Sequence, residues 1–525
     1  MPSQQQPITD LNVAYSAGAL NEFFSLAPRD VEGALVQPRT VDRPALVAAL
    51  RRYAARFGAH DAVAQNLRKL EHPQSRVVVT GQQTGLLLGP VYTLTKAFAA
   101  INLARRLDTE DKPVVPVFWL ASQDHDGLEI DHNYLLDASD TLKRVAVALP
   151  EGVPAGRIPM TEQYLATAIA AVAAMTPEAR CRAMVTRMLQ TTARRSDTFA
   201  DWFAAQMYAL LGGTGLLLVD PLQDDIAPLF AGVLRREIEE PNVTPAAINA
   251  AGTALRELGF EPQLGRGIDA TNLFIELRDG ELPKRVLLRF DGHGFTADGR
   301  RFSRQDLLDL LAADPTVITP AAGLRPVTQD SLLPTAAFVI GPGELKYVAQ
   351  LRDVYAFHDV AMPLAWPRAH VSIVEPLVAR LLDGFSLTAS EFKRRGPALL
   401  DELLLEQHGH ASRFNKAAGD VEELFEQLLV EVSGIDPTLK GTVARGHRNL
   451  AITLERLRSK SAAALARRDS ELKRQVERLV AHLLPLGQDA ERVLSPYSHI
   501  LKFGAQPLLD RYAGMEPAGH HELRL

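Results

Sequence analysis

Three groups of polar residues in this chain combine side-chain types that can bind and activate a small molecule. The first is Gly81-Gln82-Gln83-Thr84-Gly85, followed by Gly89-Pro90 and then by Thr93 and Lys96. Glutamine amides donate and accept hydrogen bonds, and glycine lets a ligand approach the backbone. A helix starting at Gly89-Pro90, with Pro90 as its first residue, would expose amides that attract an anion, with Thr93 and Lys96 on one face. The pattern predicts a phosphate or carboxylate site.

A purely structural alternative stays open for this first group. Thr93 could bond its local backbone, and Lys96 could be a solvated lysine. No Gly-Lys-Ser/Thr sequence follows the glycines, so the loop is not a Walker-type nucleotide loop.

The second group is Asp124-His125-Asp126, followed by Glu129, Asp131 and His132. Carboxylates beside an imidazole can orient the ring and assemble a general base that deprotonates an amine or a thiol. His125 and His132 could share a helix face, but their seven-residue spacing matches no standard zinc pattern, so we do not expect a metal. The structural alternative is that Asp124 or Asp126 caps a helix.

The third group contains Arg325, Gln329-Asp330, Gly341-Pro342-Gly343-Glu344 and Tyr347. Arg325 is suited to bidentate binding of a carboxylate or phosphate, and Glu344 could receive a substrate ammonium. Arg368 is a further candidate of the same kind as Arg325. The alternative for each charged residue is a surface ion pair.

The elements that must position these groups follow an α/β order. Apolar residues 76–80 and 113–120 read as strands, and residues 91–107 between them read as a helix. Two parallel strands joined by a helical crossover close right-handed, so the first two groups should meet at the carboxyl edge of a sheet. Residues 336–340 form a third predicted strand, which also ends in a glycine turn.

The rest of the chain contains further predicted helices and strands. Leu46, Leu50, Tyr53 and Phe57 recur at helical spacing before the first strand. A second set of predicted elements comprises helix 199–211, strand 216–220, helix 244–258, strands 273–277, 285–290 and 294–302, and a helix from 341 through Leu351.

A long helical region follows residue 375. Phe414, Val421 and Leu428 recur every seven residues, with Ala417 and Leu424 offset by three, which predicts an a/d seam. Ser433-Gly434-Ile435-Asp436-Pro437 breaks the pattern. A second arm then carries Leu450, Leu454, Leu457, Leu472, Val476, Leu479 and Leu483. We expect an antiparallel hairpin that pairs two copies of the chain, with packing on the body as the alternative.

Composition narrows the class of protein. Apolar residues make up 46% of the chain and charged residues 23%, which is typical of globular proteins. The net charge of −6 argues against a nucleic-acid partner. Cys181, the only cysteine, lies in a helical-looking run at 178–184 and excludes an intrachain disulfide. Neither a secretory profile nor a membrane-length apolar run is present, so we expect a cytoplasmic protein without a membrane partner.

Taken together and in this order, the motifs resemble the bacillithiol biosynthesis cysteine-adding enzymes, the BshC family. The resemblance covers most of the chain and rests on joint order rather than on any single motif. Gln123 and Asp330 stand where the family pattern has an acidic residue and a glutamate. The matching stretches are Thr80-Gly81-Gln82-Gln83, Gly89-Pro90-Val91-Tyr92-Thr93, Lys96, Pro116-Val117-Phe118-Trp119, Asp124-His125-Asp126, His132, Arg325-Pro326, Gln329-Asp330, Leu333-Pro334, Gly341-Pro342-Gly343-Glu344, Tyr347, and the closing Arg492, Lys502, Phe503 and Gly504.

The resemblance implies a Rossmann-like parallel-sheet core, two inserted connecting segments and a C-terminal antiparallel α-helical coiled-coil arm that pairs protomers. We expect core segments at 1–137, 199–230 and 315–375, insertions at 138–198 and 231–314, the arm at 376–485, and a segment returning to the core at 486–525.

The resemblance also implies the last step of bacillithiol synthesis, in which the carboxyl group of L-cysteine joins the glucosamine amine of glucosaminyl malate. His125, oriented by Asp124 or Asp126, would take the amine proton, and Glu344 would bind the cysteine ammonium. ATP or another adenine nucleotide stays open as cosubstrate. The alternatives are a nucleotide-dependent transferase or ligase acting on another amine, and a non-catalytic metabolite-binding scaffold.

Overall fold

The computed structural model describes residues 10–175, 181–278, 280–467 and 469–525. The chain divides into two compact units. The first takes in the residues up to Ser139, Lys143–Val371 and Glu491–Leu523, and the second takes in Asp140–Leu142, Ser372–Ala490 and Arg524–Leu525.

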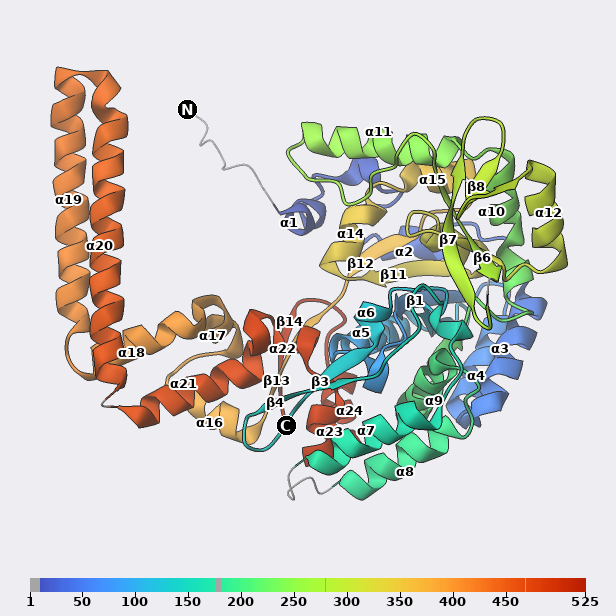
Figure 1. Cartoon of the computed structure of the whole chain (residues 1–525), viewed down its shortest axis with the longest axis horizontal. Helices are drawn as coiled ribbons and strands as arrows, with labels where there is room; N and C mark the ends of the chain where they lie inside the picture. Colours follow the sequence, from blue (N-terminus) through green and yellow to red (C-terminus); the bar gives the residue numbers. More distant parts are fainter. Residues whose placement is uncertain (1–9, 176–180, 279, 468) are drawn as a thin grey trace. The chain divides into compact units, whose positions relative to one another are not determined.

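A five-stranded parallel sheet forms the centre of the first unit (Figure 1). Its order is β12 (Leu364–Pro367), β11 (Thr335–Ile340), β1 (Arg76–Gln82), β2 (Val114–Leu120) and β5 (Leu217–Val219). The chain adds β2 and β5 on one side of β1 and adds β11 and β12 on the other. The point where the order reverses lies between β1 and β11, and open α/β sheets bind ligands there, at the carboxyl ends of the strands. The predicted Rossmann-like parallel core is confirmed.

Helices cover both faces of this sheet because its strands are apolar on both sides. Phe118 of β2 faces α9 (Phe199–Leu211), where its ring lies 6.3 Å from that of Phe203. The next residue, Trp119, points to the other face, and its ring lies 6.5 Å from that of Phe230 of α10 (Ala227–Glu239). Two further sheets have two strands each, β3 (His132–Leu136) with β4 (Leu142–Ala146) and β13 (His370–Val374) with β14 (His520–Arg524). Further helices are α1 (Leu11–Ser16), α2 (Val31–Val36), α3 (Arg43–Phe57), α4 (Asp61–Glu71), α5 (Tyr92–Leu107), α6 (Gly127–Ile130), α7 (Glu162–Ala174), α8 (Arg182–Ala193), α13 (Arg325–Leu332), α14 (Pro342–Val348), α15 (Arg352–Phe357), α22 (Ala490–Val493), α23 (Tyr497–Phe503) and α24 (Ala505–Ala513).

Residues 270–320 form an antiparallel sheet of their own, which belongs to the first unit. The order is β10 (Ile318–Pro320), β6 (Ala270–Arg278), β7 (Pro283–Phe290), β8 (Phe295–Ala297) and β9 (Arg300–Phe302). Helix α11 (Val243–Glu257) precedes β6 in sequence, and α12 (Arg304–Ala313) lies between β9 and β10. The prediction of one strand over 294–302 is wrong. Asp298 and Gly299 adopt φ of 47° and 74°, the left-handed conformation of a tight hairpin turn, and split the segment into β8 and β9.

Two helical boundaries differ from the sequence-based expectation. The helix after β11 ends at Val348 rather than continuing through Leu351. Cys181 is the N-cap residue of α8, and the remainder of its predicted helical run at 178–180 lies outside the described residues.

The second unit is helical: α16 (Pro376–Gly384), α17 (Ala389–Arg395), α18 (Leu399–Gln407), α19 (Ala411–Ile435), α20 (Lys440–Ala466) and α21 (Ser470–Leu483). Helices α19 and α20 lie side by side as an antiparallel hairpin (Figure 1). The predicted coiled-coil arm is confirmed, but its second arm is shorter than expected. Leu472, Val476, Leu479 and Leu483 belong to α21, where they pack with residues of α16 and α18 instead of with α19.

Within the described ranges, none of the helices is both long enough and apolar enough to cross a membrane.

Candidate functional site

A cavity of about 640 Å³ opens at the carboxyl ends of β1, β2 and β11, beside the point where the strand order reverses. Its volume falls in the range of about 300–1,000 Å³ that small-molecule sites occupy. Residues of all three predicted groups line it together. These are Gly81, Gln82, Gln83, Tyr92, Lys96, Asp124, His125, Arg325, Gly341, Gly343, Glu344, Tyr347 and Arg368.

Gly81 allows β1 and β2 to approach closely at the floor of the cavity. A Cβ atom at this position would lie 2.8 Å from the carbonyl oxygen of Trp119, its partner across the two strands. Any larger residue would therefore push the strands apart. Two residues later, Gln83 donates from Nε2 to Asp124 Oδ2 over 2.7 Å and also to Glu129. The first group thus fixes the loop of the second.

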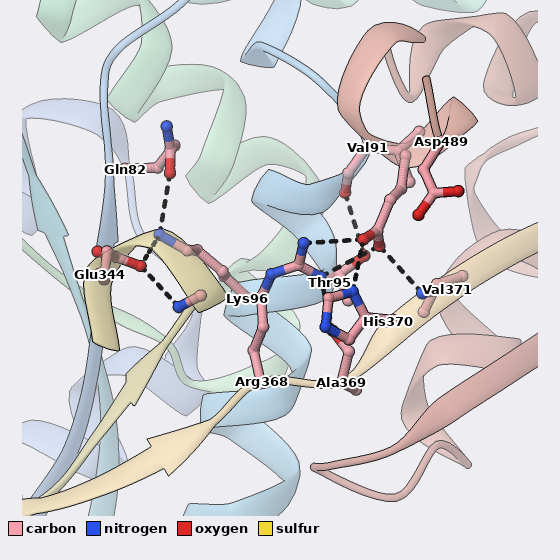
Figure 2. Close-up of polar contacts among 12 residues, drawn as sticks. Gln82, Val91, Thr95, Lys96, Glu344, Arg368, Ala369, His370, Val371 and Asp489 are labelled. Atoms are coloured by element: carbon pink, nitrogen blue, oxygen red, sulfur yellow. Dashed lines mark hydrogen bonds and ion pairs between the residues drawn. The ribbon is translucent and has the colours of Figure 1, made fainter. Parts of the chain in front are cut away.

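Lys96 is buried, and its ammonium is surrounded by oxygen atoms (Figure 2). Its Nζ lies 2.6 Å from Glu344 Oε2, 2.9 Å from the carbonyl oxygen of Gly81 and 3.0 Å from Gln82 Oε1. An ammonium group has three N–H donors, and these three acceptors use all of them. Burial lowers the pKa of Lys96, and the negative charge of Glu344 opposes that shift. Lys96 therefore joins the ends of β1 and β11 as a fixed cation.

Glu344 has two roles at the start of α14. Its Oε2 accepts a hydrogen bond from the backbone amide of Gly341 over 2.8 Å, in addition to its contact with Lys96. Its other oxygen, Oε1, has no hydrogen-bond partner in the described part of the chain. This free oxygen can accept a hydrogen bond from a ligand.

His125 contacts a residue that we did not nominate from the sequence. Its Nδ1 lies 3.0 Å from Nη1 of Arg285, which β7 brings from the second sheet. Its ring lies 5.4 Å from that of Phe274 on β6. Asp124 is farther from the ring, with Oδ1 4.0 Å from Nδ1, and this oxygen accepts the backbone N–H groups of His125 and Asp126. Asp124 therefore holds the loop rather than the imidazole.

Arg325 is the first residue of α13, and no carboxylate of the described residues forms a hydrogen bond or ion pair with it. Its guanidinium donates to Gln329 Oε1 over 3.0 Å and to the hydroxyl of Tyr347 over 3.3 Å. Although burial alone would lower it, the pKa of Arg325 is raised by Tyr347 and Glu344. The positive charge of Arg325 is therefore available to bind an anionic ligand.

Two more guanidinium groups reach the cavity near Tyr92. Arg368 donates to Glu491 over 2.8 Å and 3.2 Å. It also donates to the carbonyl oxygen of Ala369, the next residue along the chain (Figure 2). Burial opposes ionisation of Glu491, but hydrogen bonds from His370 and Arg368 lower its pKa to about 2. The neighbouring Arg492 has no hydrogen-bond or ion-pair partner among the residues that the structure describes.

Several residues nominated from the sequence lie outside the cavity. Thr80 donates to the carbonyl oxygen of Val339 and ties β1 to β11. Asp126 caps α6 by accepting from the amide of Leu128, as the structural alternative foresaw. His132 begins β3 and pairs with Asp131 at 2.6 Å, so it does not share a helix face with His125.

The start of α5 does not form the expected anion site. The helix begins at Tyr92 with Val91 as its N-cap, so Pro90 is not its first residue. The amide of Val91 donates to the carbonyl oxygen of Leu494 over 2.7 Å, which closes this end with the C-terminal segment. Gly89, Pro90 and the buried Thr93 do not line the cavity.

Gln329 and Asp330 support the cavity from behind. Gln329 holds Arg325 and donates to Asp330 Oδ1 over 3.0 Å. Burial raises the pKa of Asp330, whose other oxygen accepts the hydroxyl of Tyr355 at 2.5 Å.

Sequence reasoning missed the lining residues of the second sheet, Phe274, Arg285 and Pro320. Phe274 and Arg285 lie in the segment 231–314 that we expected to be an insertion, and nothing in the local sequence of any of the three links it to the strand ends of the core. Arg492 was visible only through the family resemblance, and Gln123 only as a departure from the family pattern. In the described portion of the chain, no group of three or more His, Cys, Asp or Glu residues is placed to hold a metal ion.

Comparisons with known sequences agree with the fold. The sequence model described as bacillithiol biosynthesis BshC, N-terminal Rossmann-like domain, matches residues 5–369, and the one described as bacillithiol biosynthesis BshC, C-terminal coiled-coil domain, matches residues 371–521. A Thermus thermophilus protein named "Putative cysteine ligase BshC" is 37% identical over 91% of this chain and 93% of its own length. A protein of the same name from Geobacillus kaustophilus is 32% identical over 94% of this chain and 94% of its own length. Another, from Salinibacter ruber, is 31% identical over 92% of this chain and 89% of its own length. The chain therefore belongs to the bacillithiol biosynthesis BshC family.

Proposed function

We propose that this protein is a ligase that joins the carboxyl group of L-cysteine to the glucosamine amine of glucosaminyl malate, forming an amide in the last step of bacillithiol synthesis. Family membership and the names of the relatives support a cysteine ligase. The substrates and the bond are our inference from the resemblance and from the charges of the cavity.

The observation that carries the proposal is that one cavity holds charged groups of both signs with atoms that have no partner among the described residues. Arg492 and Arg325 contact no carboxylate in the described residues, whereas Glu344 keeps one oxygen free. Cysteine brings an ammonium and a carboxylate, and the malate group brings two more carboxylates. Guanidinium groups bind carboxylates through two parallel hydrogen bonds. The cavity complements both substrates in the signs of their charges.

We assign the cavity residues to substrates on this basis. Arg492 and Arg325 bind substrate carboxylates, and Glu344 Oε1 accepts the cysteine ammonium. Lys96 keeps Glu344 in place from behind. His125, at the end of β2, contacts the group that reacts.

The test is synthesis by the purified protein. L-Cysteine and glucosaminyl malate are incubated with and without ATP, and the amide product is measured by mass spectrometry. Glucosamine without malate serves as the matched control substrate, since it has the amine but lacks the carboxylates. Product from glucosaminyl malate in at least one arm, with little from glucosamine, supports the proposal. If unrelated amines are converted as fast as glucosaminyl malate, the protein is more consistent with a ligase that acts on another amine.

A non-catalytic scaffold would give no product in any arm. Deleting the gene then leaves the cellular low-molecular-weight thiol unchanged, whereas loss of a ligase depletes the thiol and accumulates its amino-sugar precursor. The thiol profile of the deletion strain separates these two cases.

We also propose that the protein is a homodimer joined by the hairpin of α19 and α20. No residue of α19 is buried, and only Ala462 of α20 is. Leu424, Val430 and Leu457 are 48%, 77% and 56% exposed. A partner copy that covered these side chains would remove this apolar surface from water.

A further inference from the structure

Arg285 is held rigidly by the second sheet and points at His125. Its Nε donates to Thr319 Oγ1 over 2.8 Å, and its Nη2 donates to the carbonyl oxygen of Pro320 over 2.7 Å. Its guanidinium carbon lies 3.9 Å from the centre of the Phe274 ring. The third nitrogen, Nη1, is left to contact His125 Nδ1 at 3.0 Å. Two fixed contacts and a ring face thus determine where this nitrogen lies.

The chemistry of arginine decides the direction of that contact. A guanidinium has five N–H donors and no acceptor, so Nδ1 must accept the hydrogen bond through its lone pair. In a neutral imidazole the proton then lies on Nε2. A proton on Nδ1 would have no acceptor there, and an imidazolium would stand 3.0 Å from a second cation.

The other charges around His125 do not reverse this preference. The charged groups that face the ring are Arg285 from β7 and Asp124 and Asp126 from its own loop. Asp124 Oδ1 is 4.0 Å from Nδ1 and is committed to two backbone amides, and Asp126 caps α6. Burial, followed by the charge of Arg285, lowers the pKa of His125. The ring is therefore neutral at physiological pH.

We propose that Arg285 is a positioning residue that fixes His125 as the neutral tautomer with its proton on Nε2, so that His125 donates a hydrogen bond to the reacting carboxyl oxygen of the substrate. This inference rests on the proposed ligase function for the identity of the substrate. It replaces the sequence-based expectation that His125 removes the amine proton, because the lone pair required of a base is already used by Arg285.

The tautomer can be read without substrate. Protein labelled with ¹⁵N-histidine is compared with the His125→Gln variant to assign the His125 signals by NMR. We expect the wild-type signals of an Nε2-protonated ring whose pKa is lower than that of an ordinary histidine. In Arg285→Ala the ring should titrate at higher pH and lose its single tautomer, and Arg285→Lys should restore part of both properties.

Arg289→Ala is the matched control. Arg289 lies on the same strand and is exposed, and among the described residues it pairs only with Asp269, so its loss should leave the His125 signals unchanged. A wild-type ring that carries its proton on Nδ1, or that titrates identically in Arg285→Ala, would overturn the proposal. The wild-type measurement decides the tautomer even if Arg285→Ala does not fold.

Kinetics of two His125 variants test the donor role separately. Glutamine carries an amide N–H that can replace the Nε2–H donor but cannot act as a base. Loss of one donor to a developing oxyanion costs about 10²–10³-fold in kcat. We expect that loss in His125→Ala and a loss of only about 10-fold in His125→Gln, since the amide donor is retained.

Equal and large losses in both variants would overturn the donor role. Failure of the ligase function looks different from either result: the wild-type protein would make no product at all, while its histidine spectra would still report the tautomer.

Discussion

At the scale of single residues, Lys96 is the side chain on which the cavity wall depends. Replacing it with methionine keeps most of the volume but leaves Glu344, Gly81 and Gln82 without their donor. Removing one partner of a buried ion pair costs about 3–5 kcal/mol of stability, and we expect roughly the lower value because Glu344 is partly exposed. Product formation should fall by at least ~100-fold as the positions of Glu344 and β11 are lost.

Denaturant unfolding and product assays of Lys96→Met measure both effects. The matched control is Lys69→Met, which removes the half-exposed ion pair between Lys69 and Asp108 on the surface. Such pairs contribute about 0–1 kcal/mol, so the control should unfold like the wild type. A Lys96 variant that behaves like the control would remove Lys96 from its supporting role.

A substitution of Gln123 should affect substrate binding and protein stability in different ways. It lines the cavity at the end of β2, and its Nε2 is buried without a partner in the described residues. A buried donor left unpaired costs stability, so Gln123→Met should leave the free energy of unfolding unchanged or raise it by about 1 kcal/mol. If substrate supplies the missing acceptor, kcat/KM should fall about 10-fold or more.

Gln223 offers a control for this substitution. Its Nε2 is also buried without a partner in the part of the chain that the structure describes, but Gln223 does not line the cavity at the strand ends. Gln223→Met should therefore change stability in the same direction and leave kcat/KM unchanged. A kinetic defect of equal size in both variants would mean that Gln123 has no contact with substrate.

At the scale of elements, Glu491 of α22 anchors the C-terminal segment to the start of β13. It accepts hydrogen bonds from Arg368, from His370 and from the amide of Val371. Its folded-state pKa is about 2 against an ordinary value of 4.5. A lowered carboxylate pKa stabilises the fold above the ordinary value, and this stability is lost as the pH falls toward the folded value.

We therefore expect the free energy of unfolding to drop between pH 4.5 and about pH 2. In Glu491→Gln the stability at neutral pH should be lower, and this part of the pH dependence should be absent. Thermal unfolding across the pH series measures it. Glu516→Gln, which removes an exposed pair with Arg106, is the control and should keep the wild-type slope.

Four of the five core strands could be predicted from sequence because each carries a local signal, whereas β12 was not predicted. Apolar runs located β1, β2, β5 and β11. Glycine turns end the runs of β1 and β11, the polar cluster at 123–126 follows β2, and parallel strands bring their carboxyl ends to one edge. That argument placed Lys96, His125 and Glu344 in one cavity. It could not find Arg285, since an alternating strand pattern in an insertion shows which face a residue is on but not which distant loop it meets.

Helix boundaries show the same limit. The heptad pattern located α19, yet it also assigned α21 to the second arm, because an apolar stripe is the same whether it meets one helix or several. Leu424 was placed in the seam between the arms, but it is 48% exposed. Phe425 instead faces α20, where its ring lies 5.2 Å from that of His447.

At the scale of the whole molecule, the exposed apolar side chains of the hairpin are an argument about how many copies of the chain associate. Leu424 and Val430 of α19 and Leu457 of α20 would lie in water in a single copy. Burying apolar surface yields about 25 cal/mol per Å², so a second copy that covers any of these side chains gains stability. An isologous dimer would bring the same surface of the hairpin from both chains together.

We expect charged substitutions at Leu424 and Leu457 to dissociate the proposed dimer without unfolding either unit. We expect wild-type protein to have the mass of two chains in light scattering, and Leu424→Glu with Leu457→Glu to have the mass of one. Glu426→Ala changes an exposed polar residue of α19 and should remain a pair. If the double variant keeps the wild-type mass, or if the wild type is already a single chain, the hairpin does not join two copies. The cavity lies wholly within residues of the first unit, so a monomeric variant that keeps its helical content should retain ligase activity.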